Sequence, residues 1–200
     1  MLDWEVREGV STIKKMRKFI FITGPIASGK STFLENILFK EYKTEVNFFD
    51  DSRVGLMIRM YVNNKFILND QTLEHALENA ICDSIKNNKD FLLHCLFIDE
   101  QLDRINSYFE RFKDDFQFEA HFIRVNSIDI LLERAKKRKH LGGHSYEEKS
   151  IYGSFYQTDY NFFKYITKFR KVIFWDNSKE YDLKNIAPIG IFENRTSINY

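Results

Sequence analysis

The chain has 200 residues, a length that predicts one domain spanning 1–200 with a sizeable core. Its 30 lysines and arginines nearly balance 29 aspartates and glutamates, so no overall field draws it toward nucleic acid or an anionic membrane. The two isolated cysteines and the lack of any apolar run long enough to span a bilayer predict a cytoplasmic protein without a disulfide.

The first motif in the chain follows the apolar run 19–22, which reads as a strand. The motif G-x-x-x-x-G-K-[ST] is typical of a phosphate-binding loop, in which a strand turns sharply into a helix and backbone amides converge on phosphate oxygens. An ordinary glycine turn is the alternative, and the strand before the motif argues against it. The predicted nucleotide contacts are Gly24, Pro25, Ile26, Ala27, Ser28, Gly29, Lys30, Ser31 and Thr32.

Two of these side chains have predicted chemical roles. Lys30, at the start of the following helix, can reach the β- and γ-phosphates as a point charge. The Ser31 hydroxyl can ligate the Mg²⁺ ion that bridges those phosphates. The motif therefore predicts a bound nucleoside triphosphate with Mg²⁺.

Apolar periodicity predicts that strands and helices alternate along the rest of the chain. Helices are expected at 33–40, from 53 to about 63, and at 72–87, 101–114, 127–140 and after Ser145. Strands are expected at 45–49, 91–98, 116–125, 172–175 and 189–192. This alternation predicts an α/β fold of the P-loop nucleoside triphosphate hydrolase type, with a mostly parallel sheet and helices on both faces. Ligands of such sheets bind at the carboxyl ends of the strands.

Two aspartates follow the strand expected at 45–49. A carboxylate at the end of this strand is well placed to orient and deprotonate a hydroxyl opposite the γ-phosphate. We expect Asp51 to be this base and Asp50 to be the reserve. The alternative is that one of the two caps the next helix, because aspartate is a preferred N-cap.

A rival function is suggested by the segment 91–100. An apolar strand that closes in Asp99-Glu100 is the arrangement in which motor ATPases hold Mg²⁺ and polarise water. However, His94 and Cys95 interrupt the apolar run, and both acids equally suit the first turn of the next helix. The alternative prediction is a P-loop ATPase or nucleotide-dependent switch without a small-molecule acceptor.

The helix expected at 127–140 carries Arg134 and Arg138, four residues apart on one face. Their guanidinium groups could neutralise charge on the γ-phosphoryl oxygens, or could belong to a solvated basic face. The sequence Gly142-Gly143-His144 indicates a hinge that lets a helical lid, at about 134–160, close over the site. A histidine such as His144 more often makes a structural hydrogen bond than a catalytic one.

Several of these residues together resemble the signature of zeta-toxin-like P-loop kinases, R-x-x-x-R…GGH…I…R[YF]…N. The segment 175–178 is similar to that family's D-N-S turn after a late strand, and Asp50-Asp51 falls where the family carries its catalytic aspartate. The resemblance extends from about residue 17 to residue 195. The matching residues of the signature are Arg134, Arg138, Gly142, Gly143, His144, Ile151, Phe155 and Asn161.

This resemblance implies an enzyme that uses ATP and Mg²⁺ to phosphorylate a hydroxyl group of a small molecule. The best-described members modify the sugar nucleotide UDP-N-acetylglucosamine and act as toxins restrained by a small antitoxin protein, so both are candidates for acceptor and partner. The implied catalytic residues are Lys30, Asp51, Arg134 and Arg138. Asn177 is the implied further nucleotide contact, and the implied acceptor contacts are Asp50, Arg53, His94 and His144.

Three positions depart from the family pattern. His94 stands where the family has an acidic residue, Ser154 falls at its second lid arginine, and Glu147 falls near its usual proline. A nucleotide-binding module without catalysis is therefore a third class of function. Nucleic acid is not an expected acceptor, because the basic cluster 136–139 is short in an otherwise balanced chain.

Overall fold

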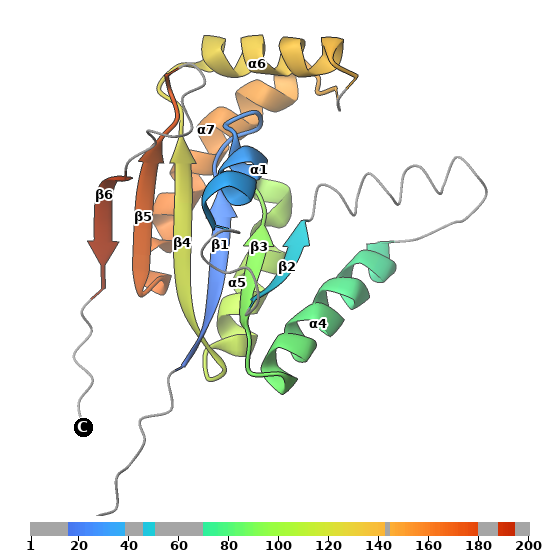
Figure 1. Cartoon of the computed structure of the whole chain (residues 1–200), viewed down its shortest axis with the longest axis vertical. Coiled ribbons are helices and arrows are strands. Elements are labelled where there is room, and N and C mark those ends of the chain that lie inside the picture. The colour runs from blue at the N-terminus through green and yellow to red at the C-terminus, as the bar shows by residue number, and fades with distance from the viewer. Residues whose placement is uncertain (1–15, 39–45, 51–69, 143–144, 180–187, 195–200) are drawn as a thin grey trace, which may run out of the picture.

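The centre of the molecule is one six-stranded sheet (Figure 1). The computed structural model describes residues 16–38, 46–50, 70–142, 145–179 and 188–194. The strand order is β2-β3-β1-β4-β5-β6, in which β6 is antiparallel to β5 and the other neighbours are parallel. The strands are β1 (Arg17–Thr23), β2 (Val46–Asp50), β3 (Asp90–His94), β4 (Phe116–Arg124), β5 (Lys171–Asp176) and β6 (Pro188–Glu193). The predicted α/β fold with a mostly parallel sheet is confirmed.

The described helices surround this sheet. Figure 1 shows α6 above the carboxyl ends of the parallel strands, with α1 lower in this view, at the end of β1. Among the described residues, none of the helices is both long and apolar enough to cross a membrane. The helical elements are α1 (Lys30–Phe33), its π-helical continuation η1 (Leu34–Leu38), α4 (Asp70–Lys86), η2 (Asp99–Gln101), α5 (Leu102–Phe112), α6 (Ile128–His140), α7 (Glu148–Tyr165) and η3 (Ile166–Lys168).

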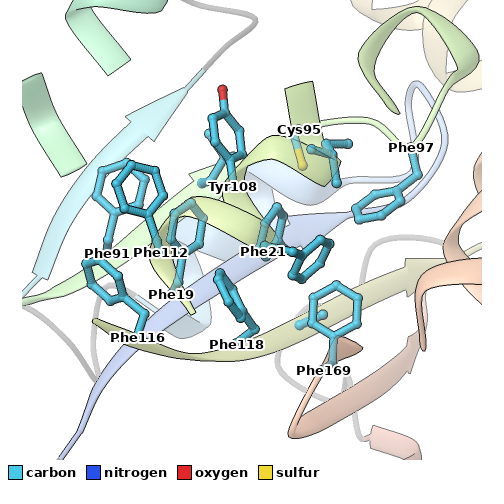
Figure 2. Packing of buried hydrophobic residues seen from close by; sticks show 14 of the residues in the cluster. Phe19, Phe21, Phe91, Cys95, Phe97, Tyr108, Phe112, Phe116, Phe118 and Phe169 are labelled. Carbon is cyan, nitrogen blue, oxygen red and sulfur yellow. The ribbon is translucent and has the colours of Figure 1, made fainter. Parts of the chain in front are cut away.

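Successive side chains of β1 point to opposite faces of the sheet, and both faces are buried because β1 is a central parallel strand. The apolar core therefore lies on both sides of β1. Phe19 and Phe21 point into an aromatic cluster, hereafter the aromatic core, which also contains Phe118 of β4 and Phe109 of α5 (Figure 2). Ile20 and Ile22 face the opposite side of the sheet, where the apolar residues of α1 and η1 cover them. The residues that cover this second face are Phe33, Leu34 and Leu38.

Two predicted elements differ from the structure. The strand expected at 91–98 ends at His94, after which the Cys95 amide makes a last bond to the Ile22 carbonyl at 3.2 Å. Residues 95–98 leave the sheet although Phe97 is fully buried, because apolar burial in the aromatic core does not require strand pairing. The helix expected from 33 continues as a π-helical turn to Leu38, and the helix expected at 53–63 lies outside the described residues.

The boundaries of α6 match the sequence signals. The Ser127 hydroxyl accepts a hydrogen bond from the Asp129 amide at 3.1 Å, so Ser127 is the N-cap of a helix that begins where one was expected. The helix ends at His140, and Gly142 follows with a φ of 78°. That left-handed conformation suits glycine and stops the helix where the sequence predicts.

Candidate nucleotide-binding site

The loop at 24–29 joins the carboxyl end of β1 to α1. Its backbone has positive φ at Gly24 (145°), Ala27 (63°) and Gly29 (93°). A Cβ atom on Gly24 would lie 2.2 Å from the Ile123 carbonyl oxygen, so only glycine lets the loop pass so close to β4. Ala27 adopts a conformation that costs an L-residue about 1–2 kcal/mol, so contacts around the loop must hold it there.

Lys30 lies at the first position of α1 and is mostly buried against the loop. Its ammonium donates hydrogen bonds to the carbonyl oxygens of Gly24, at 2.9 Å, and Pro25, at 2.8 Å. Ser31 and Thr32 follow, half-buried, in the same helical turn. Because amides in the first turn of a helix have no intrahelical acceptor, this end of α1 offers donors and a positive charge together.

These features fit a triphosphate. The positive-φ glycines let the loop turn tightly against Ile123 and Asn177, and the lysine charge lies beside the loop. Among the described residues no group of three or more His, Cys, Asp or Glu side chains gathers to hold a metal ion. The motif implies Ser31 as the residue that would hold a Mg²⁺ ion bound with the nucleotide.

Asn177, in the turn after β5, contacts the loop from the side of the sheet edge. Its Nδ2 donates to the Ser28 carbonyl oxygen at 2.7 Å, and its backbone amide donates to the Arg124 carbonyl at 2.8 Å. A Cβ atom on Gly29 would lie only 2.3 Å from the same Nδ2. The structure thus places Asn177, a residue predicted from the sequence, directly against the phosphate-binding loop. The close approach of Asn177 is a second reason for glycine at position 29, besides the positive φ.

Ser154 of α7 contacts the loop at a different residue. Its buried hydroxyl accepts a hydrogen bond from the Ile26 amide at 3.0 Å and donates one to the Ile151 carbonyl at 2.9 Å. Sequence reasoning missed this contact. The available signal was the helical spacing of Ile151, Ser154 and Thr158, which puts the serine on the buried face of α7.

The two arginines of the expected lid have different surroundings. Arg134 is half-buried, and its Nη2 donates to the carbonyl oxygens of Asn177, at 2.8 Å, and Lys179, at 3.2 Å. Arg138 is exposed one turn later on α6. The structure therefore brings Arg134 to the turn that touches the loop and leaves Arg138 on the surface.

The expected acceptor residues are only partly described. Asp50 and His94 are register partners at the carboxyl ends of β2 and β3, and His94 is also paired with Ile22 of β1. Ile22, which aligns with both residues across the sheet, lies two residues before the loop begins at Gly24. The His94 side chain is buried. Asp51, Arg53 and His144 lie outside the described residues.

Asp99 and Glu100 do not close a strand. They begin the 3₁₀ turn η2, beyond the end of β3, and both are exposed. The Asp99 carboxylate accepts a hydrogen bond from Asn161 Nδ2 of α7 at 2.8 Å. The strand-ending acid pair that the rival ATPase hypothesis requires is therefore not formed by β3.

One buried titratable group lies beneath α1. His121 of β4 accepts a hydrogen bond at Nδ1 from Trp175 Nε1 at 3.1 Å, and its ring packs near Phe33. Burial, helped by the charges of Lys18 and Lys171, lowers the pKa of His121 to about 4. The imidazole is therefore neutral near pH 7 and supports the packing beneath the loop.

The chain is similar to known proteins in its three-dimensional structure. No family model matches the sequence, and neither does any curated protein. The PezAT chromosomal toxin-antitoxin system of Streptococcus pneumoniae matches with a TM-score of 0.59 and 10% identity, over 88% of this chain and 72% of that one. The two structures share the α/β fold with a mostly parallel sheet.

Two further solved structures are similar. The Pnkp1/Rnl/Hen1 RNA repair complex matches with a TM-score of 0.56 and 17% identity over 77% of this chain, which spans 48% of that chain's length. A gluconokinase from Sinorhizobium meliloti 1021 has a TM-score of 0.45 and 15% identity, over 82% of this chain and 85% of that one. At 17% and 10% identity, the similarities to the RNA repair complex and to the PezAT system show the fold alone.

Proposed function

We propose that the protein is an ATP-dependent phosphotransferase that phosphorylates a hydroxyl group of a small molecule. The observation that carries the proposal is the loop at 24–29, with its positive φ angles and the Lys30 ammonium bonded to its carbonyls. Loops of this form at the carboxyl end of a central strand bind nucleotide phosphates. The P-loop kinase fold supports the same chemistry.

The proposed reaction is in-line transfer of the γ-phosphoryl group. The acceptor oxygen forms a bond to phosphorus, the bond from phosphorus to the β–γ bridging oxygen breaks, and ADP leaves. The acceptor's proton passes to the Asp51 carboxylate, while Lys30 stabilises charge on the phosphates. Bound Mg²⁺ would supply a further positive charge between the phosphates, with Ser31 as its protein ligand.

The acceptor site in this proposal lies at the carboxyl ends of β2 and β3. The register pair of Asp50 and His94 supports this placement, and Arg53 and His144 are proposed to complete it. We propose that Arg134 and Arg138, in the predicted lid at 134–160, neutralise charge on the γ-phosphoryl group, with Asn177 at the nucleotide. A sugar nucleotide is the first acceptor to test.

We extend the proposal to a restraining protein partner of the antitoxin kind. The support is the structural similarity to the PezAT toxin-antitoxin system, which covers most of this chain. Co-expression of the chain with the product of an adjacent open reading frame, followed by size-exclusion chromatography, tests this part. Separate elution of the two proteins would contradict it.

The central experiment incubates the protein with ATP, Mg²⁺ and a metabolite extract and searches by mass spectrometry for a new phosphorylated species. Lys30→Ala should lower its formation by about 10² or more, the scale for losing a group that stabilises transition-state charge. The matched control is Lys113→Ala, because Lys113 is exposed between α5 and β4, at the amino end of the sheet. Equal turnover of the Lys30 variant and wild type would refute the proposal.

A second variant tests the base. Asp51→Asn should bind ATP as wild type does and transfer phosphoryl about 10²-fold more slowly, the scale for a positioned proton acceptor. Unchanged turnover would remove Asp51 from the mechanism. Tight ATP binding without product from any extract would favour the non-catalytic module instead. Acceptor-independent hydrolysis that Glu100→Gln abolishes would favour the ATPase.

A further inference from the structure

Ser154 is the buried polar residue of α7 whose hydroxyl bonds to the phosphate-binding loop among the described residues. The Ser154 side chain is 2% exposed, and its hydroxyl donates to the Ile151 carbonyl one turn earlier in the helix. This donation directs the hydroxyl hydrogen back along α7, so an oxygen lone pair faces the Ile26 amide. The hydroxyl thus has a fixed orientation before any ligand binds.

Ile26 of the loop contacts both α6 and α7. Its side chain packs in an apolar cluster with Leu131 and Ala135 of α6 and Ile151 of α7. Its amide bonds to Ser154 in the same helix. One residue therefore links the backbone of the loop to both α6 and α7, and a rotation of α7 would move the peptide unit between Pro25 and Ile26.

The next residue shows why this link matters. Ala27 has a φ of 63°, and strain of this kind persists only where neighbouring contacts fix the backbone. Ser154 fixes the peptide before Ile26, and Asn177 fixes the Ser28 carbonyl at 2.7 Å on the other side. The strained residue thus lies between two peptide units that are each held from outside the loop.

We propose that Ser154 is a positioning residue for the phosphate-binding loop, whose hydroxyl fixes the Ile26 peptide so that the following amides converge on the nucleotide phosphates. The inference rests on the proposed function in one respect, that the bound nucleotide is ATP. It makes α7 part of the binding site although Ser154 touches no phosphate itself. Loss of the hydroxyl should release the loop and weaken ATP binding without unfolding the helix.

The experiment compares Ser154→Ala with Thr158→Val. Thr158 is buried one turn further along the same face of α7, and among the described residues its hydroxyl makes no hydrogen bond. Dissociation constants for ATP are measured by isothermal titration, thermal midpoints by calorimetry, and exchange of the Ile26 amide by NMR. Ser154→Ala should weaken ATP binding about 3- to 10-fold and speed Ile26 exchange by a similar factor, the range of one net hydrogen bond.

The outcomes separate this inference from the proposed function. Thr158→Val should change neither ATP binding nor Ile26 exchange, and an equal effect from both variants would mean a general packing role and overturn the inference. Wild-type protein that exchanges Ile26 as fast as an exposed amide would also overturn it, even if Ser154→Ala does not fold. Failure of the wild type to bind ATP would instead refute the proposed function, while the exchange data still decide the role of Ser154.

Discussion

Different interactions stabilise the aromatic core and the phosphate-binding loop, although β1 contributes residues to the core and leads directly into the loop. Phe21 contacts Phe97, Phe109 and Phe169 at ring-centroid distances of 5.3–6.0 Å. In this region many apolar atoms each contribute a small part of the stability. The loop depends on a few polar atoms that fix a strained backbone. We infer that substitutions in the core change stability, and that substitutions in the loop change binding.

The largest expected effect comes from the core side of this comparison. Phe21→Ala should lower the free energy of unfolding by about 3–5 kcal/mol, because it removes a fully buried ring and leaves a cavity. The folded variant should still bind ATP within about twofold of wild type, since no loop contact is lost. Urea unfolding followed by circular dichroism, with ATP titration of the folded protein, checks both parts.

An exposed aromatic residue provides the matched control. Tyr156 of α7 is 65% exposed, so Tyr156→Ala should change the free energy of unfolding by no more than about 0.5 kcal/mol. A large loss of stability in the Tyr156 variant would mean that aromatic content, rather than burial, explains the effect. A loss of ATP binding in folded Phe21→Ala would mean that core and loop are not separable.

The next effect comes from the loop. Gly29→Ala should weaken ATP binding about 30- to 150-fold, equivalent to about 2–3 kcal/mol, because alanine is strained at a φ of 93° and its Cβ would lie 2.3 Å from Asn177 Nδ2. The thermal midpoint should fall by only a few degrees if the loop relaxes away from Asn177. Isothermal titration and calorimetry measure the two quantities.

A double variant separates the two causes of this effect. Asn177→Ala in the Gly29→Ala background removes the steric conflict but not the backbone strain, so it should restore part of the ATP affinity. Asn177→Ala alone should weaken binding, because it removes the bond to the Ser28 carbonyl. Simple additivity of the two losses would show that the side chains do not interact.

The difference between the aromatic core and the loop also explains which features could be predicted from the sequence. The core was predictable because strand alternation and helix spacing repeat over many residues, as in Phe19 and Phe21. The loop was predictable because its glycines and Lys30 are adjacent in the chain. The contact from Ser154 was not, because helical spacing puts this serine on the buried face of α7 without indicating that its partner is the Ile26 amide, 128 positions away. The end of β3 was misplaced since buried Phe97 extends the apolar run beyond the paired residues.

The smallest of these effects concerns a polar residue in the packing layer beneath α1. Burial lowers the pKa of His121 to about 4, whereas an unfolded chain has a histidine pKa of about 6.5. Above pH 6.5 both states are neutral and the stability is complete. As the pH falls from 6.5 toward 4, the unfolded state binds the proton first, so stability is lost. Between pH 7.5 and 5 this loss should be about 2 kcal/mol.

Replacing the histidine isolates its contribution from that of the carboxylates, which also titrate in acid. His121→Asn keeps an oxygen that can accept from Trp175 Nε1, but it binds no proton, so its unfolding free energy should fall about 2 kcal/mol less than that of wild type between pH 7.5 and 5. His140→Asn, at the exposed end of α6, serves as the control and should retain the wild-type slope. Parallel curves for wild type and His121→Asn would mean that this imidazole is not buried neutral, and that the layer beneath α1 behaves like the polar loop rather than like the core.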